Sequence, residues 1–405
     1  MSLFDRVLKN TAFVMGGVLL NKFLKLVVLM PVLTRHLGPE GFGLYNWAFA
    51  YVALCLVVSD FGINAILTRE LSKEGRPHAL LLGNAVMMRL ALGLLAAGGG
   101  MAAAHLLGEP EAKLQALSVI LLVIVLHAGF SFRCTFQATL TMGRATVVEF
   151  VGELVDLLLV IAVVWRDGPL EAIFAVRVLV DAAMYAAFYV LGKPLIRPEF
   201  RPRWDLCREL LSESAPLALN TVFTTVYLKV GQLLIEGMRG AEDLGYYGGS
   251  VRLVEALNLI PDSLMISLFP ILSRFAGQEG GRARDAYEAA YKYMAIFVLP
   301  GALLVTGLAP WIVTTLFGAD FLPGAPALAI LIWGAFFVFI GRVTYGVLIS
   351  EGKQRWITVL VAWTAGSNLA LNFLLIPPYG PAGAAVASVA AYASMFAVAW
   401  FARDL

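Results

Sequence analysis

LTRHLGPEGFGLY, residues 33–45, is a polar, glycine-rich turn that lies between two long apolar runs. The segment GMRGAEDLGYY, residues 237–247, repeats its pattern 202 positions later. The pairs that match at this offset are Gly38 with Gly240, Glu40 with Glu242, Gly43 with Gly245, and Tyr45 with Tyr247. A second echo consists of Gly168-Pro169 and Gly380-Pro381, each of which precedes an Ala-rich apolar run. The chain is therefore predicted to contain two copies of one structural unit.

The composition indicates a membrane environment for both copies. Hydrophobic residues make up 60% of the 405 residues, charged residues make up 14%, and the mean hydropathy is +0.81. So few charges cannot cover the surface of soluble domains of this size. The connections are also short, so no domain outside the membrane is expected in which soluble-type catalysis could take place. A polytopic membrane protein that is not an enzyme is the prediction.

Twelve continuous apolar runs are each close to the roughly 20 residues that a helix needs to cross the hydrocarbon core. They lie near 11–34, 43–66, 78–106, 113–141, 146–165, 170–192, 212–237, 245–272, 287–317, 324–350, 355–377 and 380–402. Continuous runs of this length are typical of helices, whereas barrel strands alternate over about ten residues. The expected fold is therefore all-α, with six spans in each half. The expected domains are an N-terminal bundle over 1–193, a basic cytoplasmic linker over 194–209 and a C-terminal bundle over 210–405.

The basic residues in the connections predict the orientation. Seventeen Lys and Arg residues fall in the connections on the side of the N-terminus, and four fall on the other side, namely Arg35, Lys113, Arg166 and Arg239. Because cytoplasmic loops carry the excess of Lys and Arg, both termini are expected in the cytoplasm. Two six-span units that enter from the same side are parallel repeats, related by an axis along the membrane normal. The linker KPLIRPEFRPRWDLCRE, residues 193–209, is basic enough to lie against anionic headgroups, although its charges also serve simple topology.

Three segments together resemble a known family. They are Asn21, the run LTRHLGPEGFGLYNWAFAY from residue 33, and SDFGINAILTRE from residue 59, in which Asp60 and Asn64 are expected on one helical face. This combination resembles the polysaccharide transporters of the multidrug/oligosaccharidyl-lipid/polysaccharide (MOP) exporter superfamily, which include Wzx-type oligosaccharide flippases. The resemblance implies a fold like that of the multidrug transporters called MATE, V-shaped around a central cavity. Lipid II flippases of the same superfamily carry fourteen spans, which counts against that narrower assignment.

Cations inside the predicted spans are the candidates for substrate binding, because charge within the membrane is expensive and usually functional. The set comprises Lys22, Lys25, Arg89, Arg177, Arg252 and Arg342. The alternative for two of them is pairing within their own helices, Arg177 with Asp181 and Arg252 with Glu255. The other four have no acid three or four residues away in their own helices. A cleft lined by these cations would attract diphosphate and acidic sugars.

Carboxylates inside the spans are the candidates for ion coupling. Glu149, Glu153 and Asp156 form one stripe of a helix, and Asp60 and Asp181 are further members of the set. Burial favours the protonated form of a carboxyl group, so such a stripe can relay protons or bind cations. Pairing with neighbouring cations is the alternative, above all for Glu149. The equivalent helix of the second half carries Asn368 and Asn372, which keep the polarity and lose the charge.

The resemblance implies that the chain moves undecaprenyl-diphosphate-linked oligosaccharides, the repeat units of O-antigen, capsule or exopolysaccharide, across the cell inner membrane. We expect alternating access, driven by a proton or sodium ion because the sequence contains no ATP-binding module. A MATE-type cation-coupled drug or metabolite antiporter is the first alternative, and a membrane-embedded glycosyltransferase is the second. Polysaccharide polymerases or ligases are expected partners, and nucleic acid is not. No cofactor, catalytic residue or metal site is predicted. The identity of the sugar, the coupling ion and the oligomeric state do not follow from the sequence.

Overall fold

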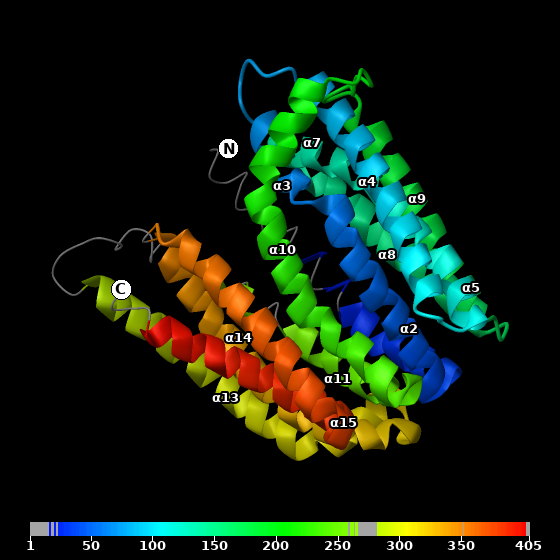
Figure 1. Ribbon diagram of the computed structural model, residues 1–405, viewed down its shortest axis with the longest axis vertical. Helices are drawn as coiled ribbons and strands as arrows, with labels where there is room; N and C mark the ends of the chain where they lie inside the picture. Colours follow the sequence, from blue (N-terminus) through cyan, green and yellow to red (C-terminus); the bar gives the residue numbers. More distant parts are fainter. Residues whose placement is uncertain are drawn as a thin grey trace. The chain divides into compact units, whose positions relative to one another are not determined.

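The computed structural model describes residues 16–17, 20–21, 23–257, 260–262, 264–265, 282–350 and 352–401, and these are helical or in turns, without strands (Figure 1). The prediction of an all-α chain is confirmed for this part of the sequence. The elements are η1 (Lys25–Leu29), α2 (Met30–Asp60), α3 (Ile63–Leu71), α4 (His78–Leu106), α5 (Glu111–Ile120), α6 (Leu122–Leu126), η2 (His127–Phe132), α7 (Arg133–Ala138), α8 (Met142–Val164), α9 (Leu170–Gly192), α10 (Trp204–Arg239), α11 (Ala241–Leu257), α13 (Arg282–Phe317), η3 (Ala319–Gly324), α14 (Ala325–Ser350) and α15 (Gln354–Phe401).

Eight helical stretches in the described residues are long and apolar enough to cross a membrane. They are Lys25–Asp60, His78–Leu106, Glu111–Ala138, Leu170–Gly192, Trp204–Arg239, Tyr287–Phe317, Ala319–Ser350 and Arg355–Ala399. Large apolar side chains stay exposed along them, for example Leu95 at 70% and Leu374 at 69%. Exposed leucines in such numbers fit a lipid-facing surface. The chain is a multi-pass membrane protein.

Two of the predicted spans are helices that fall outside this set of eight. α8 covers the predicted span 146–165, but its carboxylates Glu149, Glu153 and Asp156 make it too charged to count as apolar. α11 covers the start of the predicted span 245–272, and its 17 described residues are too short to count.

Two of the long helices contain a sharp break at a glycine that is followed by proline. In α2 the break is at Gly38, with φ 64° and ψ −179°, and in α15 it is at Gly380, with φ 54° and ψ −131°. Glycine adopts positive φ without steric cost, and the following proline cannot donate a backbone hydrogen bond. The 48 residues of α15 would measure about 72 Å as one straight helix, more than twice the hydrocarbon thickness. Figure 1 shows α15 as two arms, orange and red.

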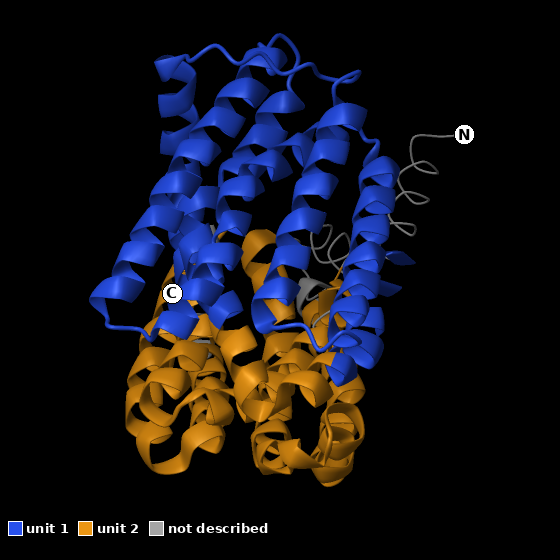
Figure 2. Ribbon diagram, turned by 90° about the vertical axis from the view of Figure 1, so that its right-hand side faces the viewer, with its two compact units in different colours: residues 1–32, 48–225 blue, residues 33–47, 226–405 orange. Residues whose placement is uncertain are grey.

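The chain divides into two compact units by its contacts (Figure 2). Unit 1 comprises 1–32 and 48–225, and unit 2 comprises 33–47 and 226–405. This division lies later in the chain than the predicted linker 194–209, and it assigns the turn at 33–47 to the second unit. The boundaries of the sequence repeat, with bundles at 1–193 and 210–405, remain a prediction.

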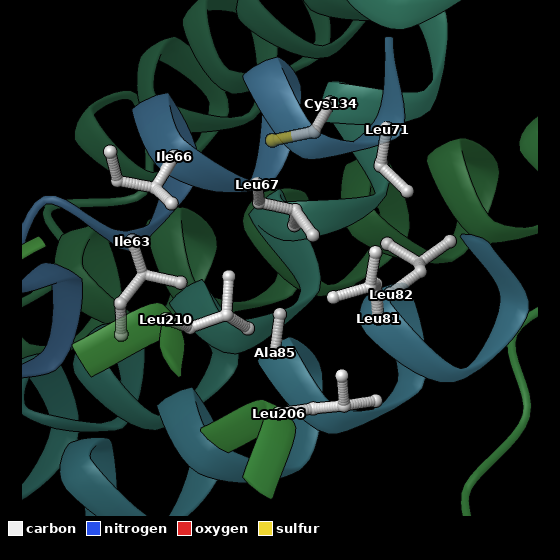
Figure 3. Close-up of a cluster of buried hydrophobic side chains, with 10 residues drawn as sticks. All are labelled: Ile63, Ile66, Leu67, Leu71, Leu81, Leu82, Ala85, Cys134, Leu206 and Leu210. Atoms are coloured by element: carbon white, nitrogen blue, oxygen red, sulfur yellow. The ribbon is translucent and has the colours of Figure 1, made fainter. Parts of the chain in front are cut away.

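In unit 1, a core of aliphatic side chains holds the short helix α3 against α4, α7 and the start of α10 (Figure 3). Ile63, Ile66 and Leu67 have the spacing of one helical face, and all three are buried. Leu206 and Leu210 of α10 belong to the same cluster. The chain after the predicted linker is therefore packed into the first unit.

In unit 2, α13, α14 and α15 pack together, and the repeated glycine turn forms a close crossing of α2 with α11. A Cβ atom at Gly43 would overlap the carbonyl oxygen of Ala241, and a Cβ atom at Gly245 would overlap that of Pro39. Ala241 stands 202 positions after Pro39, as Gly245 does after Gly43. The crossing is therefore reciprocal, because each copy contacts the other through the same pair of positions.

Candidate functional site

Arg89 of α4 is the centre of a buried polar cluster in unit 1. Its side chain is 0% exposed and forms an ion pair with Asp60 Oδ1 at 3.0 Å. The guanidinium also donates to Asn64 Oδ1 at 2.9 Å, to Ser131 Oγ at 2.8 Å and to His127 Nδ1 at 2.7 Å. The sequence predicts no acidic partner for Arg89 within its own helix, and the structure places the partner in another helix, α2. Buried charge of this kind is tolerated only when it is paired and hydrogen-bonded.

Two partners of Arg89, Asp60 of α2 and Asn64 of α3, lie on either side of a break in the backbone. The expectation that Asp60 and Asn64 share one continuous helical face is wrong, because Phe61 (φ 44°) and Gly62 (φ 70°) between them are left-handed. Asn64 Nδ2 nevertheless donates to Asp60 Oδ1 at 2.9 Å. Gly62 sits against α10, where a Cβ atom would approach the backbone of Ser214 and Ala218 within 3.3 Å.

A second cluster in unit 1 joins η1, α8 and α9. Arg177 forms an ion pair with Asp181 at 2.8 Å, four residues later in α9, which confirms the pairing that the spacing predicts. Glu153 of α8 lies 3.6 Å from Arg177 and also forms an ion pair with Lys25 of η1. Lys25 has no acid at helical spacing in its own segment, and here too an acid of another helix provides the partner.

Asp156 lies beside this second cluster without a hydrogen-bonded partner for one of its oxygens. The residue is 5% exposed, and its Oδ1 atom is buried and accepts no hydrogen bond within the described part of the chain. Arg177 and Lys25 lie within electrostatic range of its carboxylate. Asp156 is therefore held near cations but not satisfied by them.

His127 and Tyr185 connect the two clusters. The centroids of their rings are 6.1 Å apart, and the His127 ring stacks on Phe130 at 5.1 Å. Because arginine can only donate, the contact with Arg89 makes Nδ1 of His127 an acceptor, and the imidazole is neutral with its proton on Nε2. Arg177 acts on His127 electrostatically from the side of the second cluster.

The helices are irregular at both clusters. Lys25 begins the π-helical segment η1, and His127 begins the 3₁₀ segment η2, which also contributes Ser131. Both kinds of segment inside a longer helix are frequent at functional sites and hinges. We name Lys25, Asp60, Arg89, His127, Glu153, Asp156, Arg177 and Asp181 the charged network of unit 1.

The charged network contains more acids than bases. Its cations are Lys25, Arg89 and Arg177, and its carboxylates are Asp60, Glu153, Asp156 and Asp181. Three against four leaves one negative charge in excess among the described residues, with His127 neutral. A buried excess carboxylate is costly unless it binds a proton or a metal cation. The network can therefore take up one cation from outside.

Glu149 of α8 has a partner outside this network. Glu149 forms an ion pair with Arg133, as the pairing alternative for this residue predicts. Arg133 also lies over the Phe130 ring, 5.5 Å from its centroid. Lys22 lies outside the described residues.

Cations of unit 2 behave differently from one another. The predicted alternative pairing of Arg252 with Glu255 is wrong, because Glu255 forms an ion pair with Lys229 at 2.9 Å. Arg252 is partly buried and its Nε lies 3.4 Å from Asn46 Oδ1, with no carboxylate partner among the described residues. Arg342 pairs with Asp262 at 2.8 Å, and both side chains are more than 40% exposed.

Unit 2 also contains an uncharged polar cluster. Asn372 of α15 is 0% exposed and donates to Asn368 Oδ1 at 2.8 Å, and its own Oδ1 accepts no hydrogen bond in the described residues. Ser388 lies 3.5 Å from Asn368 and 3.4 Å from the hydroxyl of Tyr247. Amides and hydroxyls thus stand where unit 1 has charges.

The sequence of the chain matches two protein-family models. A family model described as polysaccharide biosynthesis protein matches residues 7–276, which is more than half of the chain. The chain belongs to the polysaccharide biosynthesis protein family. A second family model, MatE, matches residues 216–374. An uncharacterized membrane protein, MJ1068 of Methanocaldococcus jannaschii, is 30% identical over 195 residues, which are 43% of this chain. The match spans only 38% of that relative's length.

Solved structures place this family member in the fold of the MOP superfamily. The structure of the lipid II flippase MurJ in an inward closed conformation has a TM-score of 0.74 at 14% identity, over 98% of this chain and 87% of that one. An inward-facing multidrug resistance MATE family transporter of the MOP superfamily has a TM-score of 0.69 at 13% identity, covering 98% and 97%. A MOP superfamily transporter from Pyrococcus furiosus has a TM-score of 0.65 at 14% identity, covering 98% and 95%.

One member of the charged network, His127, and two of its neighbours, Ser131 and Tyr185, are not among the residues predicted from the sequence of this polysaccharide biosynthesis protein. The four histidines of the sequence have no metal-ligand spacing, so spacing alone does not point to His127. A histidine in the middle of an apolar run is itself a signal, since polar residues in spans are rare and tend to face other polar groups. That signal would have found His127, whereas Ser131 and Tyr185 are too common in spans to stand out.

Proposed function

We propose that this polysaccharide biosynthesis protein moves an undecaprenyl-diphosphate-linked oligosaccharide from the cytoplasmic to the outer leaflet of the cell inner membrane. The cargo would be a repeat unit of O-antigen, capsule or exopolysaccharide, received from glycosyltransferases and passed to a polymerase or ligase. Membership of the family and the fold shared with the structure titled lipid II flippase support this function. The chain itself acts as a transporter rather than an enzyme, with both termini in the cytoplasm.

Twelve spans in two parallel repeats are the architecture that fits this proposal. The breaks at Gly38 and Gly380 divide α2 and α15 into two spans each, and α8 and α11 supply two more. Two breaks and two further helices raise the eight apolar stretches to twelve spans. Gly240, with φ 94°, also has a positive φ, as its equivalent Gly38 does with φ 64°. The reciprocal crossing at Gly43 and Gly245 supports a two-fold relation between the repeats.

The observation that carries the transport mechanism is the single excess carboxylate of the charged network. Glu153, Asp156 and Asp181 each have a buried oxygen that accepts no hydrogen bond in the described residues, but Glu153 and Asp181 have ion-paired cations and Asp156 has none. Asp156 is therefore the residue at which a proton or sodium ion would bind. Uptake of a cation there would cancel the attraction that the Asp156 carboxylate exerts on Lys25, which is 36% exposed and the more accessible member of its ion pair with Glu153. The freed ammonium group could then bind an anionic cargo. Ion uptake and cargo binding are coupled in this way without any other energy source.

Arg252 is the cation of unit 2 that we assign to cargo binding, since no carboxylate competes for it in the described structure. Arg342, in an exposed pair, exchanges its partner for a phosphate at little cost. Arg89 and Arg177, by contrast, are so fully engaged that they hold the network in place rather than meet cargo directly. Alternating access is supported by the outward-facing and inward-facing structures that exist for MATE transporters of this fold.

The test uses a strain that lacks its own copy of the gene and has no redundant flippase. Wild-type protein restores polysaccharide export, whereas the Asp156→Asn variant is folded and inserted but leaves lipid-linked repeat units on the cytoplasmic leaflet. Arg166→Gln, an exposed arginine at the end of α8, is the matched control and restores export. Normal export in the deletion strain itself, or full activity of Asp156→Asn, contradicts the proposal.

A MATE-type cation-coupled antiporter of drugs or metabolites is the second candidate, favoured by the acid excess of the network and by the MatE match over 216–374. Arg252 separates the two functions, because a cationic drug gains nothing from it while a diphosphate does. Arg252→Gln therefore abolishes flipping but leaves drug efflux unchanged. Efflux that protects cells from a cationic dye, with normal polysaccharide export after gene deletion, selects the antiporter.

A further inference from the structure

The connection between α9 and α10, residues 193–203, is fixed to unit 1 as a strap rather than hanging as a loose tether. Asn84 of α4 is 0% exposed, and its side chain donates to the carbonyl of Arg201 at 2.9 Å and accepts from the backbone amide of Arg203 at 2.8 Å. The amide of Glu199 donates to the carbonyl of Ala79 at 2.9 Å. These bonds hold the backbone of the strap along the start of α4.

Two further contacts fix the inner face of the strap. A Cβ atom at Gly83 would overlap the carbonyl of Glu199, so the strap lies directly against the α4 backbone. Leu195 and Ile196 pack against the buried apolar clusters of unit 1. A segment with a buried inner face, three hydrogen-bonded backbone groups and no room at Gly83 presents its remaining side chains in defined positions.

The outer face of the strap is basic. The strap has four exposed cations, Lys193, Arg197, Arg201 and Arg203. It has one acid, Glu199, and a second acid, Asp205, follows two residues after its end. Four cations and two acids leave a net charge of +2. Arg201 and Arg203 pair with these acids at 2.8 and 2.7 Å, but exposed pairs of this kind are weak and open to competition by a phosphate. Arg197 has no acid partner among the described residues.

Exposed aromatic side chains accompany the charges. Phe200 is 50% exposed, and Trp204, the first residue of α10, is 77% exposed. Tryptophan at the end of a membrane span is typical of the interface between hydrocarbon and headgroups. The strap joins the ends of α9 and α10, both apolar enough to span, which places it at the height of the headgroups.

We propose that the outer face of the strap, centred on Arg197 and Arg201, binds the headgroups of anionic phospholipids in the adjoining leaflet. Trp204 and Phe200 insert at the hydrocarbon boundary while the guanidinium groups bind phosphate. Simple topology requires only that the connection be basic, and it does not require an anchored backbone or exposed aromatics. The anchored geometry therefore distinguishes a binding surface from a charge signal.

The experiment uses the full chain, purified in a neutral detergent, and titrates short-chain phosphatidylglycerol or phosphatidylcholine while tryptophan fluorescence is recorded. Phosphatidylglycerol is expected to bind more tightly, and raising the salt from about 0.1 to about 0.5 M is expected to weaken it selectively. Each basic residue near a membrane surface contributes about 1 kcal/mol, so R197Q/R201Q should bind phosphatidylglycerol about 20- to 30-fold more weakly. Phosphatidylcholine binding should not change.

Arg166→Gln is the matched control, because it removes an exposed arginine at the opposite end of a span and leaves the strap intact. Equal affinity for the two lipids, or no loss in R197Q/R201Q, overturns the proposal. If the strap instead recognises an acidic soluble protein, the chain binds the two lipids with equal affinity. The salt titration of the wild-type protein keeps the test decisive even if the double variant folds poorly.

Discussion

Each of the two units contains a buried polar cluster, and the two clusters differ in charge. In unit 1, α8 contributes Glu153 and Asp156 to a network with three cations, and in unit 2, the first arm of α15 contributes Asn368 and Asn372 to a network of amides and hydroxyls. Both sets are buried, and both contain an oxygen without a hydrogen-bonded donor, Asp156 Oδ1 and Asn372 Oδ1. The comparison teaches that both units contain a buried polar cluster in the described residues, and that the cluster of unit 1 carries a net negative charge whereas the amides and hydroxyls around Asn372 carry none.

Removal of Arg89 should have the largest effect on stability. Arg89→Gln removes the partner of Asp60, whose side chain is 29% exposed, together with the guanidinium donors for three neighbouring side chains. Breaking a buried ion pair costs up to about 3–5 kcal/mol. Arg252→Gln in unit 2 removes a cation with no carboxylate partner in the described structure and should cost less than about 1 kcal/mol. Thermal unfolding of both variants in the same detergent measures the difference.

Restoring the charge partner checks the reason for this cost. The double variant Asp60→Asn with Arg89→Gln should be more stable than Arg89→Gln alone, because the unpaired charge has been removed with its partner. If Arg89→Gln unfolds no earlier than Arg252→Gln, the charged network does not hold unit 1 together.

Adding charge to unit 2 should have the next largest effect. Asn372→Asp puts a carboxylate at a 0% exposed position without a cation beside it, at about 2.5–3.5 kcal/mol near the centre of a span. Asp156→Asn is the opposite exchange and should leave stability equal or raised, since it removes the excess charge of unit 1. The unfolding temperatures of the two variants and the wild type measure these changes in stability. An Asn372→Asp protein that is as stable as the wild type at neutral pH contradicts the prediction.

The sequence predicts the spans and the repeat better than it predicts the partners of charged residues. Runs of apolar residues are local signals, and eight helical stretches long enough to cross a membrane are found in the described residues. The count of twelve spans and the two repeats remain predictions. Pairing is a relation between helices, so spacing found only the pair within one helix, Arg177 with Asp181. It missed the partners of Lys25 and Arg89 and misassigned Glu255, because the packing of neighbouring helices is not written in any one segment.

The glycine crossing in unit 2 is expected to be equally sensitive in both repeats. Gly43→Ala and Gly245→Ala each force a Cβ atom against a backbone carbonyl, and overpacking of this kind costs about 1–3 kcal/mol. Because the contact is reciprocal, the two losses of stability should agree closely. Gly237→Ala, at which a Cβ atom meets nothing within 4 Å, is the control and should be neutral or stabilising. Strongly unequal losses at Gly43 and Gly245 contradict the two-fold relation.

The smallest effect is expected at the end of α3 in unit 1, where the cations of the ion pairs are more exposed than those inside the network. Glu70 of α3 is 2% exposed and forms ion pairs with Arg69, Lys73 and Arg76, of which the first two cations are about half exposed. Glu70→Gln keeps one acceptor oxygen for them and should cost about 1 kcal/mol at neutral pH.

The pH dependence of this cost follows from the direction of the shift. Burial raises the pKa of Glu70, but the hydrogen bonds and charges of Lys73 and Arg69 outweigh burial and hold the pKa below its ordinary value. The carboxylate therefore stabilises the fold fully above the unfolded pKa of about 4.3, and this contribution is lost as the pH falls through the lower folded-state pKa. Unfolding of wild-type and Glu70→Gln protein should differ at pH 7 and converge below pH 4. A difference that grows on acidification instead means that the cluster does not stabilise the charged form of Glu70.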